Sequence, residues 1–261
     1  LGRYWRLLIH PPLPPALNMA VDWWILTTLE EPVLRFYRWS SPALSLGYRQ
    51  QKDPPEELHT LDDNAPELIV RPSGGGYLYH EGELSYSVHL PREHPLASAG
   101  IRESYRRICE PLLDSVRELE LIDESGWGDQ DDDTANCLAS PAQHEPVYRG
   151  SKWQASAQVR RRRALLQQGS IFWNDDWSET LSETQPHFLN ADDPTVDRTR
   201  FLGHVLKNMQ QQLFPDRTGR SCPIPSNEWG TIRETASCFQ VDTLEELPTF
   251  RRHNRQEPSQ S

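Results

Sequence analysis

Cys137 and Lys152 are the two residues of this chain whose types and positions most directly suggest chemistry. Cys137 follows an acidic segment and has no helical or alternating apolar pattern around it. That context is typical of an exposed, reactive thiol, although an incidental packed thiol would give the same pattern. Lys152 is one of three lysines among 27 basic residues. A lysine in so arginine-rich a chain suits a site that needs an amine able to lose its proton, and a surface lysine is the plain alternative.

A run of three glycines forms a second candidate site. Gly74, Gly75 and Gly76 follow Arg71 and lie between two predicted strands. Consecutive glycines cost backbone entropy, and they suit a loop whose backbone approaches a ligand or offers N–H groups to an anion or a carbonyl. Arg71 could add a charge-assisted contact at the mouth of this loop. No Lys-Ser/Thr pair follows the glycines, so the loop is not a Walker motif, and a wide hairpin turn is the plain alternative.

Three helices are predicted to support these sites. Apolar residues at helical spacing indicate helices over residues 16–31, 101–121 and 201–214. Pro15 suits the first turn of the first helix, and Pro32 should end it. Cys109 falls beside the apolar face of the second helix, so we expect it to be a core thiol.

Short strands are predicted in larger number than helices. β-rich or alternating runs indicate strands over residues 3–9, 33–39, 43–46, 67–70, 77–80, 84–90, 147–149, 152–159 and 165–173. Strands and helices do not alternate regularly, which favours an α/β fold of the α+β type, a mixed sheet flanked by helices.

The sequence also predicts a structure or a role for three connecting segments. Residues 81–83 should turn a hairpin between the strands at 77–80 and 84–90. Residues 123–136 hold five Asp and one Glu, and their spacing fits a solvated acidic loop better than a calcium loop. Residues 160–163 are four arginines in a predicted turn. They are candidates for docking acidic protein partners, or they serve solubility alone.

The composition excludes some classes of function. The net charge is −11, so the chain should bind neither nucleic acid nor anionic membranes in general. No apolar run of spanning length and no signal peptide is present in the sequence. The four cysteines form no CxxC pair. We therefore expect a cytoplasmic protein with free thiols.

A set of motifs resembles the lipoate–protein ligase A family over residues 3–173. In chain order they are Asn18-Met-Ala-x-Asp22, Arg35-Phe-Tyr-Arg-Trp39, Pro42-Ala-x-Ser-Leu-Gly47, Arg71-Pro-Ser-Gly-Gly-Gly76 with His80, Glu83-Leu-Ser-Tyr-Ser87, Gly150-x-Lys152, Ser156-Ala-Gln158 with Arg160, and Leu166-Gln-x-Gly-Ser170. Within that family, the order Cys137, Pro141, Glu145, Lys152 is similar to the cysteine-dependent octanoyltransferase branch.

The resemblance implies a biotin/lipoate protein ligase-like catalytic domain with a large mixed β-sheet whose central site holds an acyl chain. It implies catalytic roles for Cys137 and Lys152 and no metal ligands. It implies substrate-binding roles for Arg71, Ser73, Gly74, Gly75, Gly76, His80, Ser156, Ala157 and Gln168. The chain departs from the family pattern at three positions: Val70 stands where many members have Arg, Ala155 where Gly is usual, and Gln168 where His is usual.

The implied activity is transfer of an octanoyl group from acyl carrier protein to a lysine of a lipoyl-domain or glycine cleavage H-type protein. Such transfer needs a nucleophile that forms a thioester and then yields the acyl group to an amine, and a thiolate does both. Lys152 can act as the base for Cys137, because the pKa of a desolvated lysine falls readily. The glycine loop, or the backbone near Lys152, could supply donors to the oxyanion. This reaction uses no cofactor.

Three alternatives remain open from the sequence. An ATP- and Mg²⁺-dependent lipoate–protein ligase would use Lys152 to bind the acyl-adenylate, and Cys137 would be incidental. A non-catalytic binding module of the same fold is the second, and nucleic-acid binding through residues 160–163 is the third. We expect one catalytic domain over residues 1–250, without a further C-terminal domain, and a flexible tail over residues 251–261.

Overall fold

The computed structural model describes residues 3–60, 65–119, 125–127, 146–148, 151–162, 164–172 and 198–241. Cys137 and the predicted tail at 251–261 lie outside these ranges.

The first helix, α1 (Pro15–Thr28), forms where the apolar spacing predicts it. Pro15 occupies its first turn, where the missing N–H costs no hydrogen bond. The helix ends three residues before the predicted end at 31, because Leu29 already adopts an extended conformation. An extended chain there also suits the approach to Pro32, which disfavours helical geometry in the preceding residue.

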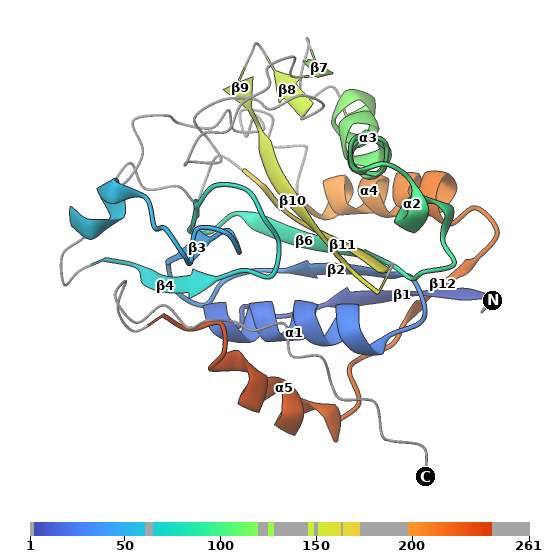
Figure 1. Cartoon of the computed structure of the whole chain (residues 1–261). Coiled ribbons are helices and arrows are strands. Elements are labelled where there is room, and N and C mark those ends of the chain that lie inside the picture. The colour runs from blue at the N-terminus through green and yellow to red at the C-terminus, as the bar shows by residue number, and fades with distance from the viewer. Residues whose placement is uncertain are drawn as a thin grey trace.

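A six-stranded mixed sheet forms the centre of the molecule (Figure 1). Its strands, in spatial order, are β10 (Gln154–Arg161), β11 (Ala164–Ile171), β6 (Leu84–Leu90), β2 (Val33–Tyr37), β1 (Tyr4–Ile9) and β12 (Thr218–Ser221). The pairs from β10 to β2 are antiparallel, whereas β2–β1 and β1–β12 are parallel. The predicted large mixed sheet is confirmed.

Helices cover both faces of this sheet (Figure 1). On one face lie α1 and α5 (Glu228–Ala236), and on the other lie α2 (Pro95–Ser98), α3 (Ile101–Glu118) and α4 (Arg198–Leu213). Each face buries its own apolar cluster against the sheet. Cys109 of α3 is fully buried, which confirms the expected core thiol. Among the described helices, none is both long and apolar enough to cross a membrane.

A small three-stranded sheet packs beside the large one and corrects the hairpin prediction. It consists of β4 (Glu67–Val70), β3 (Ala43–Leu46) and β5 (Leu78–His80), with the short 3-10 helix η1 (Glu56–Thr60) nearby. β5 pairs with β3, whereas β6 pairs with β2 and β11. Residues 81–83, with Gly82 at φ 78°, therefore carry the chain from the small sheet into the large one. A strand buried along its whole length, as β6 is, has no alternation that could reveal its partner.

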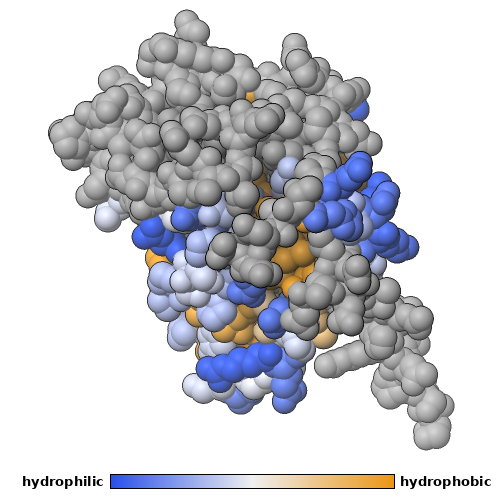
Figure 2. Space-filling view, turned by 90° about the vertical axis from the view of Figure 1, so that its left-hand side faces the viewer, coloured by the Kyte–Doolittle hydropathy of each residue, from blue (hydrophilic) through white to orange (hydrophobic). Residues whose placement is uncertain are grey.

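The face that carries η1 and the small sheet is shown in Figure 2. Hydrophobic residues are visible in the middle of its described part, and hydrophilic residues lie on either side of them (Figure 2).

A second three-stranded sheet contains β7 (Ser125–Trp127), β8 (Pro146–Tyr148) and β9 (Ser151–Lys152). β7 falls inside the segment 123–136, which was expected to be loop throughout. β7 pairs with β8, which is distant in sequence, and a local sequence pattern does not reveal such a partner.

Candidate active site

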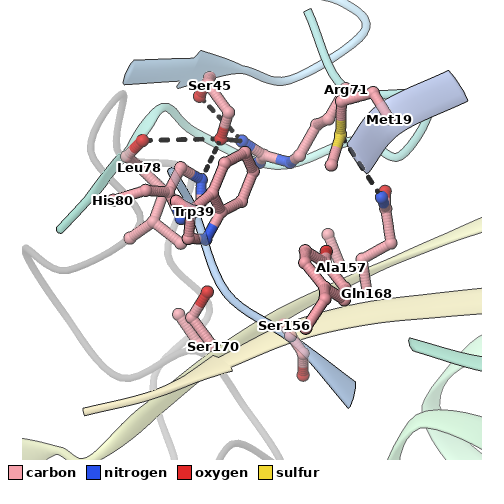
Figure 3. Close-up of a pocket in the computed structure, with 13 residues that line it drawn as sticks. Met19, Trp39, Ser45, Arg71, Leu78, His80, Ser156, Ala157, Gln168 and Ser170 are labelled. Atoms are coloured by element: carbon pink, nitrogen blue, oxygen red, sulfur yellow. Dashed lines mark hydrogen bonds between the residues drawn. The ribbon is translucent and has the colours of Figure 1, made fainter. Parts of the chain in front are cut away.

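A cavity of about 370 Å³, partly open to solvent, lies where the large sheet, the small sheet and α1 meet. Six of its lining residues come from β10 and β11: Ala155, Ser156, Ala157, Gln168, Gly169 and Ser170. The remaining wall comes from α1, β2 and the small sheet: Met19, Tyr37, Trp39, Ser45, Arg71, Leu78 and His80. Figure 3 shows the labelled side chains from these elements gathered around one space.

Arg71 is held inside the glycine loop instead of pointing outward from its mouth. Its Nη1 donates to the carbonyl oxygen and the hydroxyl of Ser45, at 2.9 and 3.1 Å. Its Nη2 donates to the carbonyl oxygens of Gly74, at 2.7 Å, and of Gly76. The guanidinium therefore fixes the loop's carbonyls on one side of the loop backbone. The expectation of a contact at the mouth is corrected to one of internal support, although Arg71 also lines the cavity.

The loop needs glycine at two points that the backbone geometry identifies. Gly75 has φ 85°, a conformation that favours a residue without Cβ. Gly47, at the end of β3, faces the loop so closely that a Cβ on it would lie 1.9 Å from the Gly75 carbonyl oxygen. Gly74, by contrast, has open space where a Cβ would stand.

His80 connects the cavity wall to a buried carboxylate. Its Nδ1 lies 2.6 Å from Oε1 of Glu83, and its Nε2 lies 2.7 Å from the Ser45 hydroxyl. The imidazole also stacks on Trp39, with ring centroids 4.0 Å apart. Because Arg71 donates to Ser45, these contacts form a continuous series, which we call the small-sheet chain: Glu83, His80, Ser45 and Arg71.

A second buried series reaches the glycine loop from the large sheet. The Ser73 hydroxyl donates to Oε1 of Gln168 at 2.7 Å, and Nε2 of Gln168 donates to Asp22 at 2.7 Å. Asp22 is paired with Arg35 at 2.7 Å, and both side chains are fully buried. We call this series the large-sheet chain: Ser73, Gln168, Asp22 and Arg35. No spacing in the sequence predicts the contact between the Gln168 amide and the Asp22 carboxylate.

The large-sheet chain continues to His10, which directly follows β1. Arg35 Nε donates to Nδ1 of His10 at 2.9 Å. Burial, and then the positive charge of Arg35, lower the pKa of His10 from 6.5 to about 4. Burial beside Asp22 raises the pKa of Tyr37 well above its usual value, so this cavity residue is a neutral phenol.

Ser156 and Ala157, which are predicted to bind substrate, line the cavity, but the Ser156 hydroxyl points away from it (Figure 3). That hydroxyl donates to the Tyr105 hydroxyl on α3 at 2.7 Å. Neighbouring residues of a strand face opposite sides, so Ala155 and Ala157 supply the small side chains on the cavity side. Ser156 contributes backbone there.

Of the two predicted catalytic residues, the structure describes Lys152 but not Cys137. Lys152 is 6% exposed and pairs with Val147 in the β8–β9 ladder. It precedes the cavity residue Ala155 by three positions, and it is not itself a lining residue. Cys137 lies outside the described residues, so its distance from Lys152 stays a prediction.

Two of the arginines at 160–163 make contacts within the protein. Arg160 donates to the carbonyl oxygens of Ala97 and Ala99, at 3.1 and 2.7 Å, and to the Ser104 hydroxyl. Arg161 lies over the ring of Trp23, 4.7 Å from its centroid. Arg160 therefore ties the end of β10 to α2 and to the start of α3, which leaves less free charge for a docking surface than the sequence suggests.

Sequence reasoning missed several cavity residues, and the signals differ. Met19, Tyr37, Trp39 and Ser170 stand inside the quoted motifs, so the motifs themselves pointed to them. Leu78 lies outside these motifs and looks like an ordinary core residue at its strand spacing. Only the packing of the elements around it shows that it borders a cavity.

Comparison with known proteins finds relatives that carry the same name. A curated octanoyltransferase LipM from Moorella thermoacetica is 38% identical over 175 residues, which are 64% of this chain and 64% of that protein. An octanoyltransferase LipM from Oceanobacillus iheyensis is 33% identical over 218 residues, 82% of this chain and 74% of the relative. The chain thus spans 64% of the length of the first of these relatives.

The fold is also that of solved lipoate-protein ligases. A proposed lipoate protein ligase from T. acidophilum, with bound lipoic acid, superposes with a TM-score of 0.74 at 22% identity, covering 94% of this chain and 98% of that one. A lipoate-protein ligase A bound with ATP gives 0.73 at 22% identity, covering 89% and 94%. At this identity the likeness concerns the fold alone. The family model described as "Lipoyl protein ligase A/B catalytic domain" matches residues 14–209, and the chain belongs to that family.

Proposed function

We propose that this protein is an octanoyltransferase that carries the acyl group on Cys137. The observation that carries the proposal is the identity of 38% with a curated octanoyltransferase over 175 residues. Octanoyl–acyl carrier protein would be the donor. A lysine of a lipoyl-domain or glycine cleavage H-type protein would be the acceptor. No cofactor enters this reaction.

The cavity supports binding of an acyl chain. Met19, Tyr37, Trp39 and Leu78 give it an apolar wall, and Ala155 and Ala157 leave room between the strands. Ligand cavities are commonly lined by apolar side chains with a few placed polar groups. The polar groups here converge at the glycine loop, where the acyl carbonyl would lie.

The reaction would proceed in two acyl transfers. Lys152 takes the thiol proton of Cys137, and the thiolate attacks the octanoyl thioester carbonyl. The carrier thiol leaves with that proton, and a new thioester remains on Cys137. The acceptor lysine amine then attacks this thioester, an amide forms, and the Cys137 thiol is released. Backbone N–H groups of the glycine loop would stabilise the oxyanion in each step.

Replacement of the nucleophile tests the proposal. Cys137→Ala and Cys137→Ser should abolish transfer of octanoyl to a lipoyl domain, while circular dichroism shows the fold retained. Intact mass after incubation with octanoyl–acyl carrier protein should show a hydroxylamine-sensitive adduct in the unaltered protein only. Cys222→Ala is the matched control, because Cys222 is an exposed free thiol. Transfer that persists in Cys137→Ala and requires ATP would establish the ligase alternative instead.

The proposed base is tested separately. Lys152→Arg should lower the rate of Cys137 acylation nearly as much as Lys152→Ala, because arginine cannot lose its proton at neutral pH. A rate in Lys152→Arg close to that of the unaltered protein would show that only a positive charge is needed. Exposed Cys222 should alkylate more slowly than Cys137 at neutral pH if Lys152 activates the latter.

We also propose a reducing, cytoplasmic setting. It is supported by Cys109, Cys222 and Cys238, which are free thiols in the described residues.

A further inference from the structure

Glu83 is a buried carboxylate at the back of the cavity wall, and none of the roles proposed above uses it. Its side chain is 1% exposed. Its Oε1 lies 2.6 Å from His80 Nδ1 and 3.3 Å from the hydroxyls of both Ser85 and Ser170. Its Oε2 accepts from the backbone N–H of Glu81 at 2.8 Å. Burying a charged group costs free energy unless hydrogen-bond donors surround it. The donors around Glu83 therefore offset the cost of burying its carboxylate.

The donors of Glu83 are also parts of the cavity. His80 and Ser170 line the cavity from two different sheets. Ser85 accepts a hydrogen bond at 2.9 Å from the indole of Trp39, a third lining residue. One carboxylate therefore contacts lining residues of β5 and β11 directly and Trp39, which follows β2, through Ser85. A change at Glu83 should reach these three parts of the wall.

Glu83 also determines the direction of the hydrogen bonds that lead to the glycine loop. Because a carboxylate only accepts, the proton of a neutral His80 lies on Nδ1, and Nε2 presents its lone pair to the Ser45 hydroxyl. Ser45 then donates to Nε2, and its oxygen is free to accept from Arg71 at 3.1 Å. Arg71 in turn binds the carbonyls of Gly74 and Gly76. Figure 3 shows Ser45 between the imidazole and the guanidinium.

We propose that Glu83 is a positioning residue for acyl transfer. It orients the glycine loop through His80, Ser45 and Arg71, and it holds the cavity wall through Ser85 and Ser170. This inference rests on the proposed octanoyl transfer and adds a residue to its machinery. Since the loop's donors would act on the oxyanion, the effect of Glu83 falls on the transition state more than on binding of the acyl donor.

The arrangement Ser45, His80, Glu83 also has the order of a serine hydrolase triad. Two observations make Ser45 a relay instead of a nucleophile. Its side chain is fully buried within β3, and the positive guanidinium of Arg71 donates to the oxygen that would have to attack. An acyl ester on Ser45 is therefore not expected.

The experiment compares Glu83→Gln with Glu81→Gln. Glu81 lies in the same turn, and its carboxylate accepts from Tyr79 instead of from His80. In octanoyl transfer, Glu83→Gln should lower kcat roughly tenfold to a hundredfold, as loss of oxyanion stabilisation does, with KM within about threefold. Glu81→Gln should change neither constant. Ser45→Ala should show the same loss as Glu83→Gln, and the double variant should be no worse than either, because residues of one series are not additive.

A second readout does not depend on the reaction. Amide hydrogen exchange at Gly74, Gly75 and Gly76 should become faster in Glu83→Gln and Ser45→Ala, with the core of α3 unchanged, and should stay unchanged in Glu81→Gln. Equal exchange and equal kcat in Glu83→Gln and Glu81→Gln would overturn the inference, as would an octanoyl ester mapped to Ser45. If the unaltered protein transfers no octanoyl group, the proposed function fails, and the exchange rates alone still decide whether Glu83 positions the loop.

Discussion

The small-sheet chain and the large-sheet chain hold the same glycine loop from opposite sides, and they are built differently. The large-sheet chain contains a complete ion pair, because Arg35 and Asp22 are both fully buried and 2.7 Å apart. In the small-sheet chain, the guanidinium of Arg71 binds carbonyl and hydroxyl oxygens instead, and the carboxylate of Glu83 binds neutral donors and His80.

The presence of an ion pair in one chain and not in the other predicts different roles for the two chains in stability and in positioning the loop. Removing one partner of a buried ion pair leaves a full charge without compensation, which is among the most costly single changes in a protein. Removing one member of the small-sheet chain leaves polar groups short of a hydrogen bond, a smaller cost. We therefore expect the large-sheet chain to control the free energy of unfolding and the small-sheet chain to control the conformation of the loop.

The largest expected effect is on stability, at Asp22. Asp22→Ala leaves Arg35 buried without its carboxylate, and it also removes the acceptor for Gln168. The free energy of unfolding in urea should fall by about 3–5 kcal/mol, the range for broken buried pairs. Glu83→Gln is the comparison variant and should lose less than half as much. Equal losses in the two variants would remove the distinction between the chains.

Much of the fold was predictable because its signals are local. The three helices and most strands of the large sheet follow from apolar spacing and proline positions, as α1 shows between Pro15 and Pro32. The strand β12 was missed, because all four of its residues are exposed and none of them is apolar. The prediction of a hairpin turn at residues 81–83 was wrong, because the pairing partner of a strand depends on contacts distant in sequence.

The second prediction concerns the loop itself. Gly47→Ala places a Cβ 1.9 Å from the Gly75 carbonyl oxygen, so the loop backbone must shift. We expect a loss of about 1–3 kcal/mol in stability, as for other overpacked sites. Octanoyl transfer should fall at least tenfold, because small displacements of positioned groups are costly to catalysis.

Gly74→Ala is the matched control for this substitution. Gly74 belongs to the same loop and has open space where its Cβ would stand, so the melting temperature should stay close to that of the unaltered protein. Similar losses of stability at both positions would mean that the loop tolerates no side chain for reasons other than the contact with Gly47.

The site was less predictable than the fold, for a physical reason. The residues with recognisable chemistry, such as Arg71 and His80, could be found from motifs, and both line the cavity. Their partners could not be found in this way: that Arg71 binds Gly74 and Gly76 from within, or that Gln168 joins Ser73 to Asp22, depends on how two sheets and a helix pack. A side chain such as Leu78 lines the cavity although its sequence pattern is that of an ordinary core residue.

The third prediction uses pH to weaken the large-sheet chain. The pKa of His10 is lowered to about 4 in the folded protein from 6.5, so the unfolded chain binds the proton more readily. Stability should therefore be full above pH 6.5 and decrease as the pH falls from 6.5 towards 4. Since His10 is partly exposed, we expect roughly 1–2 kcal/mol after allowance for solvent screening.

His89 contributes in the same direction, because burial lowers its pKa to about 4 as well. Urea unfolding at pH 7 and pH 4.5 measures the sum, and His10→Gln and His89→Gln separate the two histidines. Each substitution should flatten part of the pH dependence. A pH profile unaffected by His10→Gln would show that protonation of His10 does not act on the pairing of Arg35.

The smallest expected effect is the coupling between the two chains. Ser45→Ala interrupts the small-sheet chain next to Arg71, and Ser73→Ala interrupts the large-sheet chain at Gln168. Ser45→Ala loses the hydrogen bonds to His80 and from Arg71, and Ser73→Ala loses the one to Gln168, each worth about 1 kcal/mol in the free energy of unfolding. If the loop between Arg71 and Gly76 is one rigid unit held at two points, releasing one point lets the other relax. The double variant should then differ from the sum of the single variants by about 0.5 kcal/mol or more, whereas independent sites add within a few tenths. Unfolding in urea for the four proteins gives this coupling energy. The pair Ser45→Ala with Gly203→Ala serves as the control that should be additive, because Gly203 lies on α4 and has open space where a Cβ would stand. Strict additivity in the first pair would mean that the two chains hold separate parts of the loop, and that the ion pair of Arg35 and Asp22 has no influence on the residues that Glu83 positions.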